Sequence, residues 1–317
     1  MPVLPERLHA GDTVGIIAPA SAPPDPKAID QTLVALAELG FKPKLSRNAR
    51  KRWGFLAGTD RERATDLMEM FCDRKVRGIV CVRGGYGSGR LLPLLDYKKI
   101  QANAKVFVGY SDITSLHCAF LKHADLISFH GPMLASDFIK DGYPEFSRES
   151  FLQILTEPIA PGGICRGYTG KTVSILRKGR VSGRLIGGNL TLLTSIIGTP
   201  HEPSFKGKIL FFEDVDEKPY QTDRMLTHLL NSGRLQQVRG IAVGVCENCV
   251  DPKAKTAKEY RQTFEDVIKD RLLPLKVPLV IGLPFGHGPY NATLPIGGRV
   301  NLDANQGDLV IDGPAIR

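Results

Sequence analysis

Short apolar runs alternate with amphipathic stretches through the first half of the chain. Residues 26–39 carry apolar side chains at the spacing of one helix face, and Gly40 follows as a typical C-cap. Apolar runs predict buried strands at residues 13–18, 78–82 and 106–109. Strands that alternate with helices in this way predict an α/β fold with a doubly wound, mostly parallel sheet.

The pattern changes in the second half of the chain. Residues 157–172 are rich in Gly and Pro and have no clear period, which is typical of a linker. Beyond them, apolar runs predict strands at residues 208–212, 240–245 and 278–284. A chain of 317 residues is expected to form two domains. We therefore predict a first domain over residues 1–156, a linker over 157–172 and a second domain over 173–317.

A glycine-rich loop follows the predicted strand at residues 78–82. It spans residues 83–89 and reads Arg-Gly-Gly-Tyr-Gly-Ser-Gly. A dinucleotide-binding G-x-G-x-x-G spacing would need glycine where Arg90 stands, and the loop is not a Walker motif either. The backbone N–H groups of such a loop can bind an anion or an oxyanion. An ordinary tight turn between strand and helix is the other interpretation, and both stay open.

Ser111 stands between a predicted strand and a predicted helix. The strand at residues 106–109 ends in glycine, and an amphipathic pattern begins at Asp112. A serine at this corner lies at the positive end of a helix beside free backbone N–H groups, which suits a nucleophile. The turn differs from the G-x-S-x-G elbow, because Ile113 occupies the second glycine position. The alternative is that Ser111 is only a helix N-cap.

His287 is the histidine with the best position for a general base. It lies between two glycines at the end of a predicted strand, where its side chain can project freely. A general base needs a partner that fixes its tautomer. Glu213, at another strand end, is the candidate partner and Glu217 is its competitor. The alternative for Glu213 is an ordinary surface carboxylate.

Composition narrows the class of protein. The net charge is +9, but the basic residues are scattered, so nucleic-acid binding is not expected. No apolar run approaches the roughly 20 residues of a membrane span, and the first residues do not resemble a signal peptide. Cys72, Cys81 and Cys118 lie in apolar patterns that suit reduced core thiols in a cytoplasmic protein. Cys246 and Cys249 form a lone C-x-x-C, so no metal site is predicted.

Seven short motifs follow one another along nearly the whole chain, at residues 14–21, 54–60, 83–87, 109–114, 187–190, 212–214 and 282–287. In this order they resemble the LD-carboxypeptidases, serine peptidases that include muramoyltetrapeptide carboxypeptidases and microcin C immunity proteins. The resemblance implies a triad of Ser111 as nucleophile, Glu213 as acid and His287 as base. It also implies an oxyanion hole from the backbone N–H groups of Gly85 and Asp112. Finally, it implies a Rossmann-like first domain, a mostly β second domain with helices, and a homodimer.

These observations together predict one reaction. We expect a cytoplasmic serine carboxypeptidase that needs no metal or cofactor and releases terminal D-Ala from the murein tetrapeptide in cell-wall recycling. Such an enzyme must bind a free carboxylate, for which Arg83 is a candidate, although it can equally be a surface residue. One alternative is a microcin-immunity-type hydrolase of peptidyl-adenylates. Another is a non-catalytic nucleotide or anion sensor that uses residues 84–89, which leaves Glu213 and His287 without a role.

Overall fold

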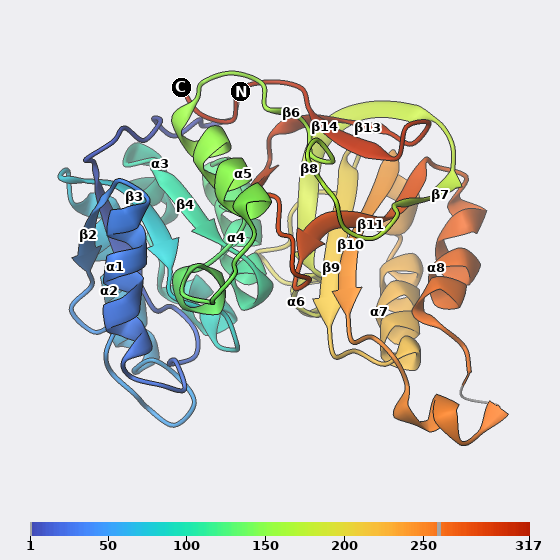
Figure 1. Ribbon diagram of the computed structural model, residues 1–317, viewed down its shortest axis with the longest axis horizontal. Coiled ribbons are helices and arrows are strands. Elements are labelled where there is room, and N and C mark those ends of the chain that lie inside the picture. The colour runs from blue at the N-terminus through green and yellow to red at the C-terminus, as the bar shows by residue number, and fades with distance from the viewer. Residues whose placement is uncertain (1, 259–260) are drawn as a thin grey trace.

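Two β-sheets lie side by side in the structure, each with helices packed against it (Figure 1). The computed structural model describes every residue except 1, 259 and 260. Buried apolar side chains from both sheets and from the helices form one continuous hydrophobic cluster. The two halves therefore pack against each other as parts of a single core.

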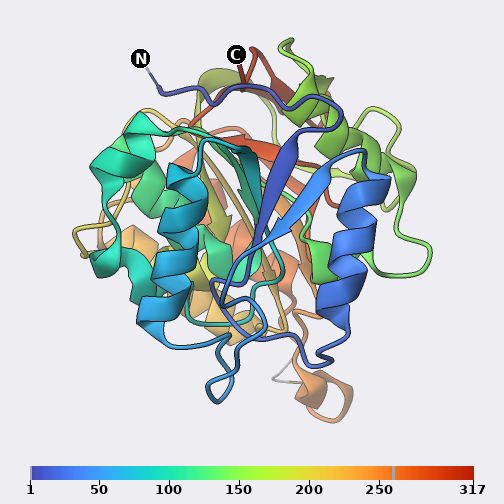
Figure 2. The same cartoon turned by 90° about the vertical axis from the view of Figure 1, so that its left-hand side faces the viewer.

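The first sheet has the strand order β12-β5-β4-β3-β1-β2. Its strands are β1 (Thr13–Ile17), β2 (Lys42–Leu45), β3 (Val76–Cys81), β4 (Val106–Gly109), β5 (Ser128–His130) and β12 (Leu294–Ile296). Neighbouring strands run parallel except β12, which is antiparallel to β5. The helices of this half are α1 (Ala28–Glu38), α2 (Asp60–Cys72), α3 (Tyr97–Ala102), α4 (Thr114–Ala124) and α5 (Glu145–Thr156). Figure 2 shows helices on both faces of the sheet, so the predicted doubly wound arrangement is confirmed.

The second sheet has the order β6-β14-β13-β8-β9-β10-β11-β7 among the described residues. Its strands are β6 (Gly162–Gly163), β7 (Ser174–Arg177), β8 (Arg180–Asn189), β9 (Ile209–Val215), β10 (Gly240–Glu247), β11 (Leu279–Gly286), β13 (Arg299–Asp303) and β14 (Asp308–Ile311). The four central strands β8 to β11 are parallel, and the outer pairs are antiparallel. Its helices are α6 (Leu190–Ser195), α7 (Pro219–Asn231) and α8 (Phe264–Leu272). This half is thus mostly β with helices, as the family resemblance implied.

Short helical turns complete the chain. Two of them, η1 (Ser88–Leu94) and η2 (Ser111–Ile113), follow β3 and β4 in the first half. The others are η3 (Leu134–Phe138), η4 (Leu235–Gln237), η5 (Pro252–Lys255) and η7 (Leu273–Leu275). None of the described helices has the length and apolar character needed to span a membrane.

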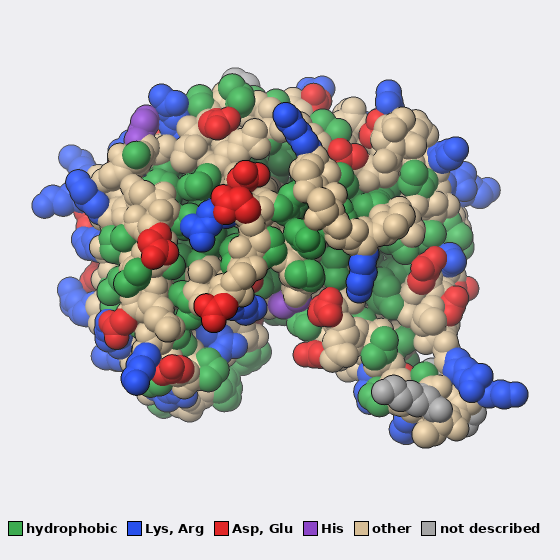
Figure 3. All heavy atoms as spheres, in the orientation of Figure 1, with side chains coloured by type: hydrophobic (Ala, Val, Ile, Leu, Met, Phe, Trp, Pro, Cys, Tyr) green, Lys and Arg blue, Asp and Glu red, His purple; other side chains and the backbone are tan. Residues whose placement is uncertain are grey.

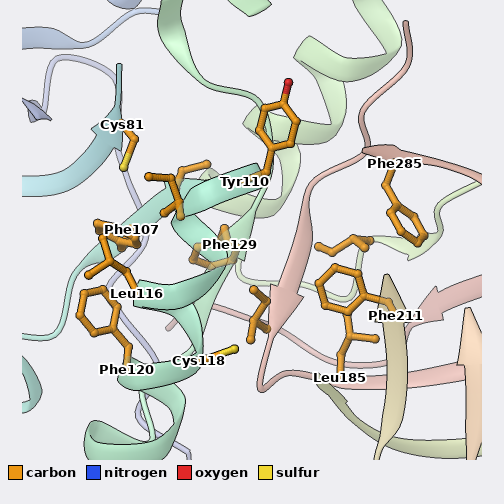
Figure 4. Packing of buried hydrophobic residues seen from close by; sticks show 14 of the residues in the cluster. Cys81, Phe107, Tyr110, Leu116, Cys118, Phe120, Phe129, Leu185, Phe211 and Phe285 are labelled. Carbon is orange, nitrogen blue, oxygen red and sulfur yellow. The ribbon is translucent and has the colours of Figure 1, made fainter. Parts of the chain in front are cut away.

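The central helix α4 joins the two halves of the core. Around it Phe107, Phe120 and Phe129 are fully buried, and the rings of Phe107 and Phe120 lie 5.0 Å apart (Figure 4). On the side of the second sheet, Phe211 and Phe285 are equally buried and pack edge to face. Burying each such ring stabilises the fold by about 2 kcal/mol. The ring of His130, at the end of β5, packs edge to face against Phe211 and so connects the two halves.

Two strands bear on the predicted division of the chain. β6 lies inside residues 157–172 and pairs with β14, so part of the predicted linker is an edge strand of the second sheet. β12 lies inside residues 173–317 but pairs with β5 of the first sheet. The boundaries at 1–156, 157–172 and 173–317 stay a prediction, and the two sheets share chain across them.

Candidate active site

The carboxyl ends of parallel strands from both sheets face one edge of the molecule. In Figure 1 the arrowheads of β4, β9 and β10 point toward the lower edge. The space-filling view is hollowed at this edge, between the two lobes (Figure 3). Ligands of open α/β sheets bind beyond the carboxyl ends of their strands. The candidate residues at these strand ends therefore border one crevice.

Ser111 occupies a sharp turn between β4 and α4. Its backbone is left-handed, with φ of 62°, a conformation that costs a non-glycine residue free energy and is found at functional turns. The turn is tight, because a Cβ on Gly109 would lie 2.9 Å from Cγ2 of Ile113. The residue before α4 is Ile113, and the Ser111 side chain caps no backbone N–H there. The interpretation of Ser111 as only an N-cap is therefore wrong.

Three side chains form a chain of hydrogen bonds in the crevice. The hydroxyl Oγ of Ser111 lies 3.1 Å from Nε2 of His287, and Nδ1 of His287 lies 2.5 Å from Oε2 of Glu213. Glu213 is on β9, and His287 directly follows β11. Gly286 makes the approach possible, since a Cβ there would lie 2.7 Å from Cβ of Glu213. The folded chain thus brings together three residues that are far apart in sequence.

Burial separates Glu213 from its competitor. The side chain of Glu213 has 0% exposure, so the interpretation as a surface carboxylate is wrong. Glu217 is partly exposed and accepts a hydrogen bond from the hydroxyl of Thr191 at 3.1 Å. The second oxygen of Glu213, Oε1, has no hydrogen-bond partner among the described residues. The interaction with His287 is therefore the principal support of a fully buried carboxylate.

The charge of Glu213 acts on the imidazole. Burial by itself would lower the pKa of His287. The charge and hydrogen bond of Glu213, together with the charges of Asp214 and Asp137, outweigh burial, and the pKa is raised. A carboxylate at this position therefore favours the imidazolium, which is the state formed when a histidine accepts a proton.

Asp214, the residue after Glu213, links β9 to the start of α6. Its carboxylate accepts hydrogen bonds from the side-chain amide of Asn189 at 2.7 Å and from the backbone N–H of Thr191 at 3.0 Å. Burial, and next the nearby charge of Glu213, raise the pKa of Asp214 to about 6. Sequence analysis assigned no role to Asn189, although it lies in one of the family-like motifs.

The glycine loop lies directly against the serine turn. A Cβ on Gly84 would be 3.1 Å from Cβ of Ser111 and 3.3 Å from the backbone nitrogen of Asp112. The backbone N–H of the next residue, Gly85, donates to no acceptor in the described part of the chain. Gly85 is left-handed as well, with φ of 103°. A carbonyl oxygen beside Ser111 can therefore be met by backbone donors from both loops.

The side chain of Asp112 ties the two loops together. Its carboxylate accepts the backbone N–H groups of Ser88 at 2.7 Å and Gly87 at 3.2 Å, and the hydroxyl of Ser88 donates to the Asp112 carbonyl at 2.5 Å. Asp112 is buried, and burial raises its pKa. The sequence pointed to the backbone of Asp112 but not to this role of its carboxylate.

Comparison with known proteins decides the family. Two family models match, that of the LD-carboxypeptidase N-terminal domain over residues 14–131 and that of the LD-carboxypeptidase C-terminal domain over residues 182–302. The probable murein peptide carboxypeptidase of Bacillus subtilis is 40% identical over 315 residues, which cover 97% of this chain and 94% of that protein. The chain belongs to the LD-carboxypeptidase family.

Other relatives and solved structures support the same family assignment. The murein tetrapeptide carboxypeptidase of Pseudomonas aeruginosa is 34% identical, with 92% of this chain and 94% of that protein covered. The crystal structure of muramoyltetrapeptide carboxypeptidase from Oxalobacter formigenes matches with a TM-score of 0.81, 32% identity and coverage of 95% and 99%. The microcin C7 self-immunity protein MccF in complex with aspartyl sulfamoyl adenosine matches with a TM-score of 0.85, 27% identity and full coverage of both chains. The resemblance drawn from the short motifs is confirmed.

Two arginines flank the glycine loop of this LD-carboxypeptidase family member. Arg63 is 1% exposed and donates to the backbone carbonyls of Pro19 and Gly87, which joins the loop after β1 to the loop after β3. Sequence analysis missed it, because an arginine within a helix normally faces solvent. Arg83 is partly buried, and its Nη2 would lie 3.6 Å from a Cβ on Gly85. Arg83 thus lies beside the glycine loop and is partly open to solvent.

The cysteines of the C-x-x-C motif lie near the acid but outside the hydrogen-bonded chain. Cys246 on β10 is opposite Asp214 in the sheet, and Cys249 donates to the carbonyl of Glu247. Burial raises the pKa of Cys246 well above its usual value. Across the residues that the structure describes, no group of three or more His, Cys, Asp or Glu side chains is arranged to hold a metal ion.

Proposed function

We propose that this protein is a serine LD-carboxypeptidase that removes the terminal D-amino acid from murein tetrapeptide. The observation that carries the proposal is the hydrogen-bonded chain from Ser111 through His287 to Glu213. The names of the relatives from Bacillus subtilis and Pseudomonas aeruginosa support murein peptide as the substrate class. The release of D-Ala and a place in cell-wall recycling are part of the proposal.

The first half of the reaction forms an acyl-enzyme. The hydroxyl oxygen of Ser111 attacks the carbonyl carbon that precedes the terminal D-residue, while Nε2 of His287 takes the hydroxyl proton. Glu213 holds Nδ1–H and stabilises the imidazolium. The oxyanion of the tetrahedral intermediate accepts hydrogen bonds from the backbone N–H groups of Gly85 and Asp112. When the C–N bond breaks, His287 returns the proton to the leaving amine.

The second half of the reaction restores the enzyme. His287 takes a proton from water, and the resulting nucleophile attacks the ester carbonyl of the acylated Ser111. The same backbone donors stabilise the second oxyanion. Collapse of this intermediate returns the proton to the serine oxygen and releases the shortened peptide with a new carboxylate. The order Ser, Glu, His along the chain matches that of α/β-hydrolases on a different fold.

Arg83 is our candidate for binding the terminal carboxylate of the substrate. Its guanidinium borders Gly85, and the hydrogen bond that it makes to the Ala22 carbonyl is long, at 3.4 Å. A guanidinium with free N–H donors suits a carboxylate, which it can bind through two parallel hydrogen bonds. Holding that carboxylate next to the oxyanion donors would place the scissile bond at Ser111.

The direct test of the proposal is hydrolysis of a defined peptide. The protein is incubated with murein tetrapeptide and, in parallel, with the tripeptide, and the products are measured by mass spectrometry. Loss of one alanine from the tetrapeptide and no change in the tripeptide is the expected result. If the tetrapeptide stays intact while a nucleotide binds tightly, the sensor alternative replaces the proposal.

The pH dependence of turnover should follow the state of His287. Glu213 raises the pKa of His287 above its usual value of about 6.5. The imidazole is therefore mostly neutral, and able to accept a proton, only at a pH above this raised pKa. We expect kcat/KM to rise with pH through an apparent pKa higher than about 6.5. A profile of kcat/KM against pH measures it. An acidic limb below this value would show that Glu213 does not act on the base.

Neither a metal nor a disulfide takes part in the proposed chemistry. We therefore expect a chelator or a mild reductant to leave turnover of the tetrapeptide unchanged, measured in the same mass-spectrometric assay. Inactivation by the chelator that added zinc reverses would point to a metal site instead, with Cys246 and Cys249 as the first candidates.

Hydrolysis of peptidyl-adenylates is the second candidate function. The match to microcin C7 self-immunity protein MccF in complex with aspartyl sulfamoyl adenosine, with a TM-score of 0.85 and full coverage, favours it. The two candidate functions would use the same catalytic residues, Ser111, Glu213 and His287, and differ in the leaving group of the substrate. Turnover of an aspartyl-adenylate analogue beside the tetrapeptide distinguishes them, and the faster substrate decides.

A cytoplasmic location and a homodimer complete the proposal. The six cysteines are all free thiols, which supports a reducing compartment. Cys81 and Cys118 are buried as predicted, whereas Cys72 is exposed, so its predicted place in the core is wrong. The homodimer rests on the family resemblance alone. Light scattering at several protein concentrations tests it, and a single mass near 34.7 kDa at all of them would contradict it.

A further inference from the structure

Three large aromatic side chains are exposed on the first lobe beside the crevice. Trp53, Phe55 and Tyr86 have exposures of 54%, 62% and 54%. Figure 3 shows hydrophobic side chains at the lower edge of the left-hand lobe, where the loops after its strands lie. A single exposed apolar side chain needs no explanation, but several exposed aromatic rings close together are typical of a binding surface. We call these three residues the aromatic ledge.

The aromatic ledge is continuous with the glycine loop. Tyr86 directly follows Gly85, and its backbone N–H donates to the hydroxyl of Ser21 at 3.1 Å. The rings of Tyr86 and Phe55 have centroids 5.7 Å apart. Leu56 is fully buried against Gly87, where an added Cβ would lie 2.4 Å from its Cδ2. A molecule held at Ser111 therefore meets the ledge if it extends over Gly85.

Backbone hydrogen bonds and an ion pair support Trp53 and the turn that carries it. Trp53 and Leu56 exchange two backbone hydrogen bonds, of 2.9 and 3.0 Å, which close a tight turn. The guanidinium of Arg90 lies 5.7 Å from the centroid of the Trp53 ring, and Asp60 fixes that guanidinium through hydrogen bonds of 2.9 and 3.0 Å. Rings that are exposed yet preorganised lose little conformational entropy when a ligand binds.

We propose that the aromatic ledge binds the sugar ring of a muramoyl-tetrapeptide, an inference that rests on the proposed function. The face of an aromatic ring is electron-rich and attracts the polarised C–H groups on one face of a pyranose. The charged groups of Arg90 and Asp60 at the same place can bind sugar hydroxyls. The ledge thereby makes the enzyme prefer a peptide that still carries its sugar. Its binding energy acts on a part of the substrate remote from the bond that breaks.

Trp53 is the only tryptophan of the chain, so its fluorescence reports on the ledge directly. The variant Ser111→Ala, which should bind substrate without cleaving it, is titrated separately with N-acetylmuramic acid, free tetrapeptide, muramoyl-tetrapeptide and adenosine monophosphate. We expect the two sugar-containing probes to change the emission of Trp53 and the free tetrapeptide not to do so. No response to either sugar probe overturns the proposal. A response to adenosine monophosphate alone also overturns it and assigns the ledge to a nucleotide.

Kinetics on two substrates give a second, independent measurement. Trp53→Ala and Phe55→Ala should each lower kcat/KM for muramoyl-tetrapeptide about threefold to tenfold and leave kcat/KM for free tetrapeptide unchanged. Trp53→Phe keeps an aromatic face and should retain most of the preference. Val34→Ala, which removes an equally exposed apolar side chain from α1, is the matched control and should change neither substrate.

The outcomes separate this inference from the proposed function. Equal losses on both substrates, or a change of oligomeric state in Trp53→Ala, overturn the sugar-binding role while murein peptide cleavage stands. If the wild-type protein cleaves neither peptide, the proposed function fails, and the fluorescence titration still decides whether the ledge binds a sugar.

Discussion

Replacing Ser111 with alanine is expected to lower turnover of murein tetrapeptide by about four to six orders of magnitude. The hydroxyl supplies the oxygen that would become acylated, and no other described hydroxyl contacts Nε2 of His287. The fold should survive, because alanine has the same Cβ as serine and adds no strain to the left-handed backbone at this position. The variant loses a single hydrogen bond, about 1 kcal/mol. Initial rates, measured beside a thermal melt, test both parts.

Ser232→Ala is a matched control for this variant. Its hydroxyl donates to a helix carbonyl on α7, away from the crevice, so turnover should be unchanged. If folded Ser111→Ala retains turnover near that of the wild type, the nucleophile has been misassigned. A variant that unfolds would be replaced by Ser111→Cys, which keeps a nucleophile of similar size and should retain measurable acylation.

The second large effect is expected at the acid. Glu213→Gln should lower turnover by about three to four orders of magnitude, because the amide loses the charge that stabilises the imidazolium and can select the wrong tautomer. Glu217→Gln should lower it less than about tenfold, since that side chain contacts Thr191 rather than His287. Turnover of the two variants, with circular dichroism as a fold check, gives the comparison.

The same pair of variants makes a prediction about pH. Without the charge of Glu213, the pKa of His287 should fall, so the acidic limb of the kcat/KM profile should move to lower pH in Glu213→Gln. Glu217→Gln should leave the limb in place. A larger loss of turnover in Glu217→Gln would transfer the role of acid to that residue. Equal small losses would mean that another group orients His287.

Local patterns placed the candidate residues at strand ends, and the family resemblance was needed to assign them as a triad. The apolar runs that become β4, β9 and β11 place Ser111, Glu213 and His287 at or just beyond strand ends. The choice between Glu213 and Glu217 followed from the same rule, because a strand end holds a side chain more rigidly than a loop. All three residues lie on or beside a buried strand, and for Ser111 and His287 that strand ends in a glycine.

Other parts of the site depend on contacts that no local pattern encodes. Arg63 is buried because two loops converge on it, and its helix alone would place it in solvent. The carboxylate of Asp112 binds the loop after β3 only after the strands have paired. β12 is three residues long, and its pairing with β5 joins positions that are far apart in the chain. Periodicity reports the burial of a residue but not the strand with which it pairs.

The placement of β12 has a consequence for the folding of the protein during synthesis. Residues 294–296 are translated 166 positions after residues 128–130 of β5, whose edge they cover. Until the ribosome has released them, the sheet that carries Ser111 has an open edge, a structure prone to pairing with other chains. If this sheet folds while the rest of the chain is being made, as N-terminal domains usually do, β5 therefore stays exposed as an edge until β12 arrives. His287 emerges only a few residues before β12, so a nascent chain carries neither a finished sheet nor a base for its serine.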